Sequence, residues 1–480
     1  MSLFDQRALQ PGVTRREVLA WAGYDFANSG YTTVVVTAVF SAYFVGVVAN
    51  GADWATFVWS LILAISNLAV MLTMPGIGAR VDANGSRKQW LLGVTLVCVV
   101  CIAALYWVRA GDVALAVVMI IISNYCYSLG ETFCAAYLPE LARPEAIGRV
   151  SGWGWSFGYV GGMLTLGLSL AWVAWVKGQG GEVEDYVPGT MLIAAVIYIL
   201  AAMPMFLVVK ERARPRAQEA SRMVQSPVDW RTSWLRIRAY GDFQRLLWVG
   251  FFYNAGVAVV IALTAVYADQ VLGFEPADTM QLFFAVNVAA AIGAFLFGYL
   301  EDHIGHRMSL ALTLVGWVVV VLVAVFIEGR PAFWCAATLA GVCMGSSQSA
   351  GRALVATMAP GHRLDEFFGL WAFATRLAAI VGPLTYGGIS WATGNNHRHA
   401  LLFTGIFFVV ALALLGRVNL TRGVAQRGGS VRGLREGALP CRHGHRNSAC
   451  HGSCVSVPPL DVKNAVWWLT ARAGCETIGH

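Results

Sequence analysis

The chain has 480 residues, of which 57% are hydrophobic and only 13% are charged. Soluble globular domains carry about 25% charged residues, so this composition excludes a protein whose whole surface faces water. Of the formal net charge of +7, almost all arises after residue 416, where nine Lys or Arg stand against three acids. The charge therefore gives no argument for nucleic-acid binding.

Long continuous apolar runs follow one another along the chain. Continuous runs of this length predict membrane-spanning helices and do not fit the alternating pattern of a β-barrel. The polar start Met1–Glu17 and the length of the first run argue against a cleavable signal peptide. The predicted spans are 20–47, 55–77, 90–109, 114–137, 152–176, 190–209, 246–269, 281–300, 309–327, 333–357, 368–392 and 400–416.

Lys and Arg are divided unevenly between the two alternating sets of loops. Up to residue 416 one set holds nineteen, nine of them within 210–245, and the other set holds four. Basic loops stay in the cytoplasm, so the first set of loops and both termini are predicted to be cytoplasmic.

The sequence also contains an internal repeat. Four residues recur at identical spacing after the second and the eighth predicted spans, displaced by 220 positions. They are Gly78, Asp82, Gly85 and Arg87 in the first copy, and Gly298, Asp302, Gly305 and Arg307 in the second. This predicts two parallel halves, 1–209 and 246–417, joined by a basic connector over 210–245.

Residues 418–480 differ from the rest of the chain. They are rich in Gly and Arg with little periodicity, which predicts a disordered tail. A shifted reading frame or a non-native extension is the alternative. Cys450-x3-Cys454 with nearby histidines is compatible with zinc, but the pattern is weak and we predict no metal site.

Several segments resemble known transporters. The first copy of the repeated loop resembles the signature loop of the major facilitator superfamily. Tyr24–Ser29 resembles the first-span motif of the autophagy-related vacuolar amino-acid effluxer family and its bacterial relatives. Segments 137–141, 148–152 and 367–383 are also similar, and the resemblance covers roughly 15–420. It departs at Cys134-Ala135, where the family pattern has Tyr-Asn, so any role of that Asn is missing here.

The resemblance implies an all-α transmembrane protein with the twelve-helix major facilitator fold, two six-helix halves around a central cavity. It also implies that the signature loops latch the halves in one access state. The implied latch residues are Gly78, Asp82, Gly85, Arg87, Arg149, Asp302 and Arg307. Asp82 and Asp302 are expected at the starts of the third and ninth spans, where a helix N-terminus favours negative charge. Arg87, Lys88 or Arg149 is the expected partner of Asp82, and the plainer alternative is a short connecting loop.

Polar and ionisable residues within spans are costly, and they mark candidate functional positions. The candidates for substrate binding or coupling are Asp25, Asn28, Asn124, Glu131, Asn254, Gln348 and Arg376. Simpler interpretations remain: asparagines can bond between helices, Asp25 can serve a helix start, and Arg352 can extend to the membrane surface. Glu131 and Arg376 lack local partners, so Arg376 is predicted to pair across helices with Glu131 or Asp25.

We predict a secondary active transporter that moves a small polar solute, with an amino acid as the lead, by proton-coupled alternating access. Alternatives are a facilitator for a sugar, drug or lysolipid, and, less favoured, a non-transporting receptor or a membrane enzyme. No Walker loop is present, and we expect no catalytic residues and no cofactor. We expect a monomer surrounded by membrane lipids in a bacterial inner (plasma) membrane, with no nucleic-acid partner.

Overall fold

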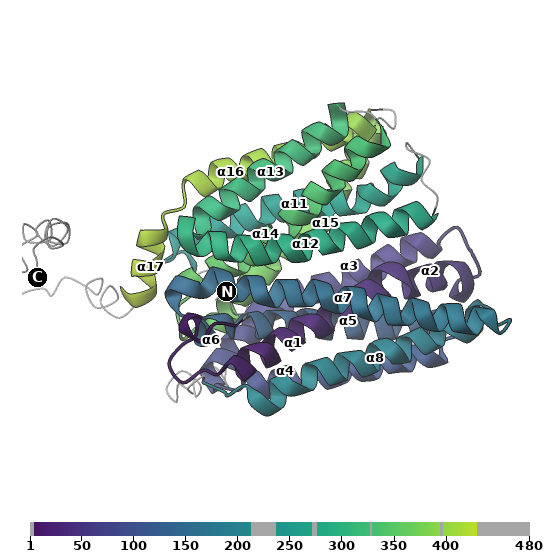
Figure 1. Cartoon of the computed structure of the whole chain (residues 1–480), viewed down its shortest axis with the longest axis horizontal. Helices are drawn as coiled ribbons and strands as arrows, with labels where there is room; N and C mark the ends of the chain where they lie inside the picture. The colour runs from purple at the N-terminus through teal and green to yellow at the C-terminus, as the bar shows by residue number, and fades with distance from the viewer. Residues whose placement is uncertain (1–3, 213–236, 271–275, 327–328, 394–396, 430–480) are drawn as a thin grey trace, which may run out of the picture. The chain divides into compact units, whose positions relative to one another are not determined.

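A computed structural model describes residues 4–212, 237–270, 276–326, 329–393 and 397–429. The described residues are almost wholly helical, which confirms the predicted all-α architecture (Figure 1). The predicted connector 210–245 lies partly outside the described residues, and the predicted tail lies mostly outside them.

The first half begins with α1 (Arg15–Tyr31), whose first turn is closed by a capping box between Thr14 and Glu17. Its axis continues through η2 (Thr32–Ala38), α2 (Phe40–Tyr43) and η3 (Phe44–Val48). The remaining elements are α3 (Ala55–Asn84), α4 (Arg87–Ala104), α5 (Val113–Ala135), the short α6 (Leu138–Leu141), α7 (Ile147–Gly178) and α8 (Val183–Val208).

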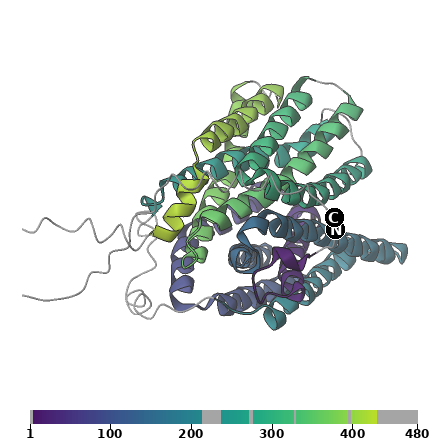
Figure 2. The ribbon, with the colours of Figure 1, turned by 60° about the vertical axis from the view of Figure 1, so that its left-hand side comes forward.

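The second half repeats this arrangement. It comprises α11 (Gly241–Gln270), α12 (Pro276–Ile304), α13 (His306–Phe326), α14 (Arg330–Met358), α15 (Leu364–Ala392) and α16 (His397–Gly416), followed by α17 (Leu420–Gly429). The helices of the two halves form two groups in both ribbon views (Figures 1 and 2).

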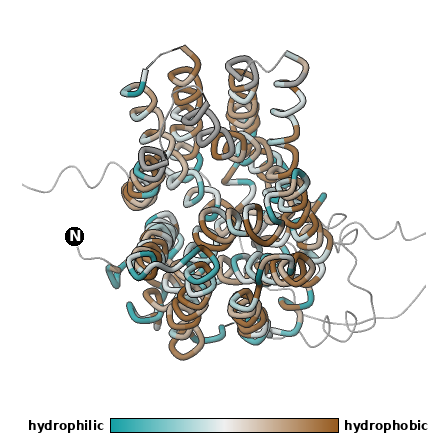
Figure 3. Tube along the Cα trace, turned by 90° about the vertical axis from the view of Figure 1, so that its right-hand side faces the viewer, coloured by the Kyte–Doolittle hydropathy of each residue, from teal (hydrophilic) through white to brown (hydrophobic). Residues whose placement is uncertain are grey.

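Hydrophobic segments dominate the long helices, as the view from one end of the bundle shows (Figure 3). By length and composition, ten helices in the described part of the chain can cross a membrane, or eleven if the bent pair α16 and α17 is one span. Helix α14 is not among them, because its inner part carries Ser346, Ser347, Gln348, Ser349 and Arg352. Its position and its 29 residues nevertheless match the tenth predicted span.

The repeated glycines end helices. Gly85 follows α3 with φ of 63°, and Gly305 follows α12 with φ of 87°. Only glycine adopts this left-handed backbone without a steric penalty, so the repeat encodes the same sharp turn in both halves.

The halves meet where α7 packs against α12 and where α3 packs against α15. At Gly152 of α7 an added Cβ would lie 3.1 Å from the Cα of Gly298 on α12, so both backbones approach closely. Within the first half, Gly158 and Gly162 of α7 face Ser29 and Thr33 in the same way. This is the tight packing that small residues at fixed spacing permit.

The start of the tail differs from the sequence prediction. Leu420–Gly429 form α17, although disorder was expected from residue 418. The fully buried carboxylate of Asp242 accepts hydrogen bonds from the Arg422 guanidinium, at 2.8 Å from Nη2, and from the backbone N–H of Asn419. Asp242 fixes the first turn of α17 from 177 positions away, so no local sequence pattern could predict this helix.

Candidate functional site

A central cavity of about 420 Å³ lies between the two halves and is lined by residues from α1, α5, α7, α11, α12, α14 and α15. Six of the seven candidate residues line it: Asp25, Asn28, Glu131, Asn254, Gln348 and Arg376. Aromatic side chains, including Tyr127, Trp155 and Trp371, form much of the rest of the wall. The cavity therefore combines charged groups with large apolar faces, as small-molecule sites do.

Arg376 and Glu131 form an ion pair across this cavity, as the sequence predicted. Nη2 of Arg376 on α15 donates to Oε2 of Glu131 on α5 at 2.6 Å. The arginine also stacks over Tyr127, 5.9 Å from the ring centroid. Its Nε is buried and has no hydrogen-bond partner among the described residues, so one donor remains for another ligand.

A second ion pair joins Asp25 of α1 to Arg352 of α14, with Nη1 donating to Oδ2 at 2.6 Å. The alternative that Arg352 extends to the membrane surface is wrong, because its side chain is only 7% exposed. Its Nε and Nη2 donate to the hydroxyl and carbonyl oxygens of Ser151, and its Cζ lies 4.8 Å from the ring centroid of Trp21 and 5.3 Å from that of Trp155.

The two cavity arginines thus differ in how fully they are bonded. Each of the three guanidinium nitrogens of Arg352 donates a hydrogen bond to Asp25 or Ser151. Arg376 is 21% exposed and keeps a free Nε. Because a buried donor without a partner is costly, Arg376 is the better ligand for a bound anion.

Three candidate asparagines make bonds within the protein. Asn124 does not line the cavity; its Nδ2 donates to Ser66 of α3 at 2.5 Å, as polar residues do between packed helices. Asn28 accepts a bond from the Tyr198 hydroxyl at 2.7 Å, which leaves its Nδ2 buried and unpaired among the described residues. Asn254 donates to the carbonyl of Gly250 on its own helix.

The departure at Cys134-Ala135 falls on this site. Cys134 is buried, and its carbonyl accepts a 2.8 Å bond from the Trp21 indole. Ala135 lines the cavity, so this chain presents a methyl group where the family pattern places an amide.

At one end of the bundle, the first signature loop binds the opposite half. We call the cluster of Gly78, Asp82, Arg87, Glu140 and Asp365 the first latch. Asp82 lies in the last turn of α3 and accepts bonds from the backbone N–H groups of Asp365 and Glu366, at 3.1 and 2.8 Å. It therefore caps the N-terminus of α15, the eleventh span, and not that of the third span, as the sequence had suggested.

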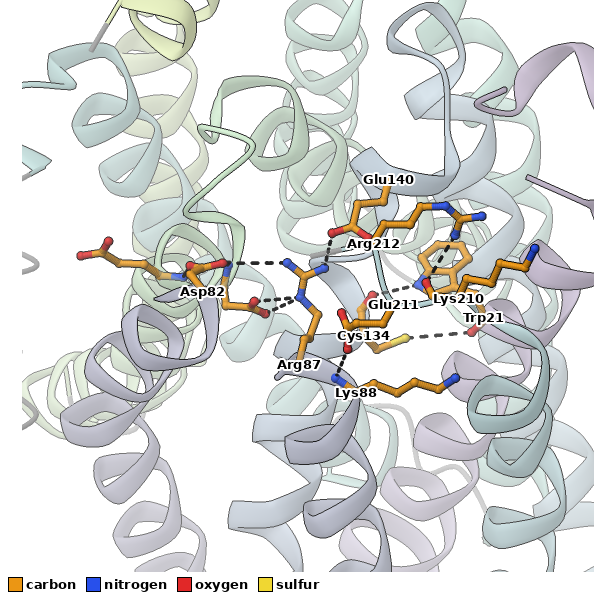
Figure 4. Close-up of polar contacts among 11 residues, drawn as sticks. Trp21, Asp82, Arg87, Lys88, Cys134, Glu140, Lys210, Glu211 and Arg212 are labelled. Carbon is orange, nitrogen blue, oxygen red and sulfur yellow. Dashed lines mark hydrogen bonds and ion pairs between the residues drawn. The ribbon is translucent and has the colours of Figure 1, made fainter. Parts of the chain in front are cut away.

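Arg87 is the centre of the first latch. It is fully buried, its Nε lies 2.8 Å from Asp365 and its Nη1 lies 2.5 Å from Glu140, while Asp82 is farther away at 3.9 Å (Figure 4). The expected pairing with Asp82 is thus the weakest of the three. Gly78 has no room for a side chain, because an added Cβ would collide with the backbone of Asp365.

The second signature loop forms the second latch, Asp302 with Arg149. Arg149 at the start of α7 donates from Nε at 3.0 Å and from its backbone N at 3.3 Å. The suggestion that Arg149 pairs with Asp82 is therefore wrong. Each signature loop caps a helix of the opposite half: Asp82 caps α15, and Asp302 caps α7. Arg307 takes no part in the ion pair and donates to the carbonyl of Gly416.

The connector begins beside the first latch. Glu211 accepts a 2.7 Å bond from the backbone N–H of Lys88 at the start of α4 (Figure 4). Lys88 Nζ donates to the carbonyl of Val209. Burial raises the pKa of the Glu211 carboxyl above its ordinary value. Arg212 pairs with the buried Glu17 of α1 at 2.8 Å, which ties the connector to the first half.

Sequence reasoning missed Arg352, Ser151, Glu140 and Asp365 as members of these clusters. Glu140 lies within segment 137–141, whose resemblance had been noted, and Asp365 precedes the similar segment 367–383. Ser151 likewise lies within the similar segment 148–152, so these three positions were within reach of the sequence.

Two repeated loops that join two six-helix halves, with a charged cavity between the halves, are the features of a membrane transporter of the major facilitator superfamily. A family model described as "Vacuole effluxer Atg22 like" matches residues 41–428, and the chain belongs to that family.

Similar proteins agree with this assignment. The uncharacterized MFS-type transporter YxiO of Bacillus subtilis (strain 168) is 25% identical over 406 residues, which cover 84% of this chain and 93% of that protein. Autophagy-related protein 22 of Cryptococcus neoformans var. neoformans is 26% identical over 194 residues, 37% of this chain and 34% of the relative.

Solved structures show the same fold at low identity. The human organic anion transporter MFSD10 has a TM-score of 0.65 at 16% identity, with 85% of this chain and 100% of that chain covered. The proton:xylose symporter XylE has a TM-score of 0.66 at 13% identity, covering 86% and 98%.

Proposed function

We propose that this transporter carries a small solute with a carboxylate group, an amino acid in the first instance, and couples its movement to a proton. The single observation that carries the proposal is the Glu131–Arg376 pair, which lies in the cavity wall and keeps one arginine donor free.

Both cavity ion pairs join the halves. Glu131 and Asp25 belong to the first half, and Arg376 and Arg352 to the second. A conformational change that separates the halves at this level must break these pairs together with the two latches. The charges in the cavity are therefore placed where substrate binding can influence which side of the membrane has access to the cavity.

A substrate carboxylate can compete with Glu131 for Arg376, because the planar guanidinium donates hydrogen bonds to two oxygens side by side. Glu131 would then be a carboxylate without its cationic partner in the cavity wall, and a bound proton neutralises it. The substrate and the proton thus bind together. An ammonium group on the same substrate has Asp25 in the cavity wall as its acidic partner.

We also propose that the latch end of the bundle faces the cytoplasm of a bacterial cell, with both termini on that side. The uneven loop charges support this orientation. We take the state with both latches formed to be the one closed at this end.

The role of Arg376 is tested by Arg376→Lys. Lysine keeps the charge but loses the planar fork, so the affinity for a carboxylate substrate should fall about tenfold or more, the equivalent of one charge-assisted hydrogen bond. The measurement is competition by unlabelled amino acids in a proteoliposome exchange assay, with normal insertion checked by size-exclusion chromatography. An unchanged affinity would show that the carboxylate binds elsewhere.

A further inference from the structure

The second signature loop carries an acid–base pair that the first loop lacks. When the second loop is aligned to the first with the shift of 220 residues, Glu301 replaces Val81 and His306 replaces Ser86. The four repeated positions are identical, so this pair distinguishes the second latch from the first.

The structure brings the two residues into contact. Nδ1 of His306 lies 2.6 Å from Oε1 of Glu301, whose side chain is only 1% exposed. Oε2 of Glu301 is buried and has no hydrogen-bond partner among the described residues.

Glu301 also lies close to the start of α7, the helix that Asp302 caps. A Cβ added to Gly148, in the first turn of α7, would lie 2.9 Å from Oδ1 of Asp302 and 2.9 Å from Cδ of Glu301. Two carboxylates therefore face the start of α7, and among the described residues only Asp302 has an arginine partner there.

The charge balance of this site depends on His306. In the described part of the chain, the charged and titratable groups in and against the loop include Tyr299, Glu301, Asp302 and His303 on α12, Arg149 on α7 and Arg307 on α13. Arg149 balances Asp302, and Arg307 is directed to the Gly416 carbonyl. A protonated His306 balances Glu301, whereas a neutral one leaves a buried carboxylate uncompensated.

We propose that Glu301 and His306 form a proton site that makes the second latch sensitive to pH. With His306 protonated the latch is neutral and stays closed. When His306 loses its proton, the buried charge of Glu301 is relieved by opening and hydration, because an unpaired ion in a protein interior costs several kcal/mol. The stabilisation of the closed latch is present at low pH and is lost as pH rises through the imidazole range.

The experiment measures the distance distribution between spin labels at Glu145 and Gly361, two exposed positions, one in each half near the latches. The full chain is studied in lipid nanodiscs without substrate. Between about pH 5.5 and about pH 8, where imidazole loses its charge, the ratio of open to closed molecules should rise about tenfold, the equivalent of one unit of difference in proton affinity.

The first loop supplies the matched control. Glu301→Val with His306→Ser installs the residues of the first loop and should abolish this pH dependence. His306→Arg supplies a permanent cation and should keep the latch closed across the range. Each variant is also measured in a Glu131→Gln background, which removes the acid proposed for coupling in the cavity.

A wild-type distribution that does not change with pH would overturn the proposal. So would an equal pH dependence in the Glu301→Val/His306→Ser protein, since the proton site would then lie outside this loop. Neither outcome bears on the substrate cavity, whose test is a flux measurement.

Discussion

Glu131→Gln is expected to abolish the accumulation of substrate against its gradient while leaving exchange of substrate across the membrane intact. Glutamine keeps a hydrogen-bonding oxygen for Arg376, 2.6 Å away in the wild type, but cannot take up a proton. Exchange needs no net movement of protons, so it should survive. Accumulation requires that each substrate moves with a proton, so it should be lost.

The size of the effect follows from the driving force. A gradient of one pH unit stores about 1.4 kcal/mol and supports about tenfold accumulation of a solute that moves with one proton. The variant should give a concentration ratio near one under the same gradient. The measurement is uptake of radiolabelled substrate into proteoliposomes, with exchange recorded in the same preparation.

Asn124→Ala is the matched control for Glu131→Gln. Asn124 lies on the same helix but bonds to Ser66 outside the cavity. Its loss should lower stability, by about 1 kcal/mol for one hydrogen bond, and leave accumulation unchanged. If Glu131→Gln still accumulates substrate, another group carries the proton or the protein is a uniporter.

Asp82→Asn is expected to open the latch end of the bundle without preventing folding. The carboxylate accepts both N–H groups at the start of α15, and an asparagine side chain has one acceptor oxygen for them. Loss of a capping interaction costs about 1 kcal/mol, and the weakened attraction to Arg87 adds to it. The ratio of closed to open molecules should therefore fall about tenfold, with transport reduced and expression near that of the wild type.

Spin labels at Glu145 and Gly361 report the opening, and substrate exchange reports the transport. Asp302→Asn is the paired comparison, because it removes the same group from the second latch. Its arginine partner Arg149 is 24% exposed, whereas Arg87 is 2% exposed, so the shift should be smaller. Full transport by Asp82→Asn would mean that the loop is only a connector.

The sequence predicted the fold and much of the cavity because hydrophobic runs and in-span polar residues are local signals. It identified Glu131 and Arg376 as groups that need partners across helices, and six of its seven candidates line the cavity. Asn124 lies on the same face of α5 as Glu131, two turns earlier. At that level α3 covers the face, so Asn124 contacts α3 and not the cavity. Helical spacing cannot show which helix lies opposite each turn.

The partners that sequence reasoning missed lie far away along the chain. Arg352 meets Asp25 across 327 positions, and Asp82 caps a helix that begins more than 280 residues later. These contacts depend on how the two halves are docked, which the residues of neither half reveal. Motif spacing shows that a loop is special without showing what it binds.

The most direct test of proton-coupled carboxylate transport is flux through the wild-type protein in proteoliposomes with an imposed pH gradient. The panel contains amino acids, neutral sugars and choline, the last as a cation without a carboxylate. At least one amino acid is expected to accumulate in the direction of proton flow. A protonophore should abolish that accumulation, and neutral sugars and choline should not compete. Flux that is insensitive to the pH gradient, or that prefers a neutral sugar, would contradict it.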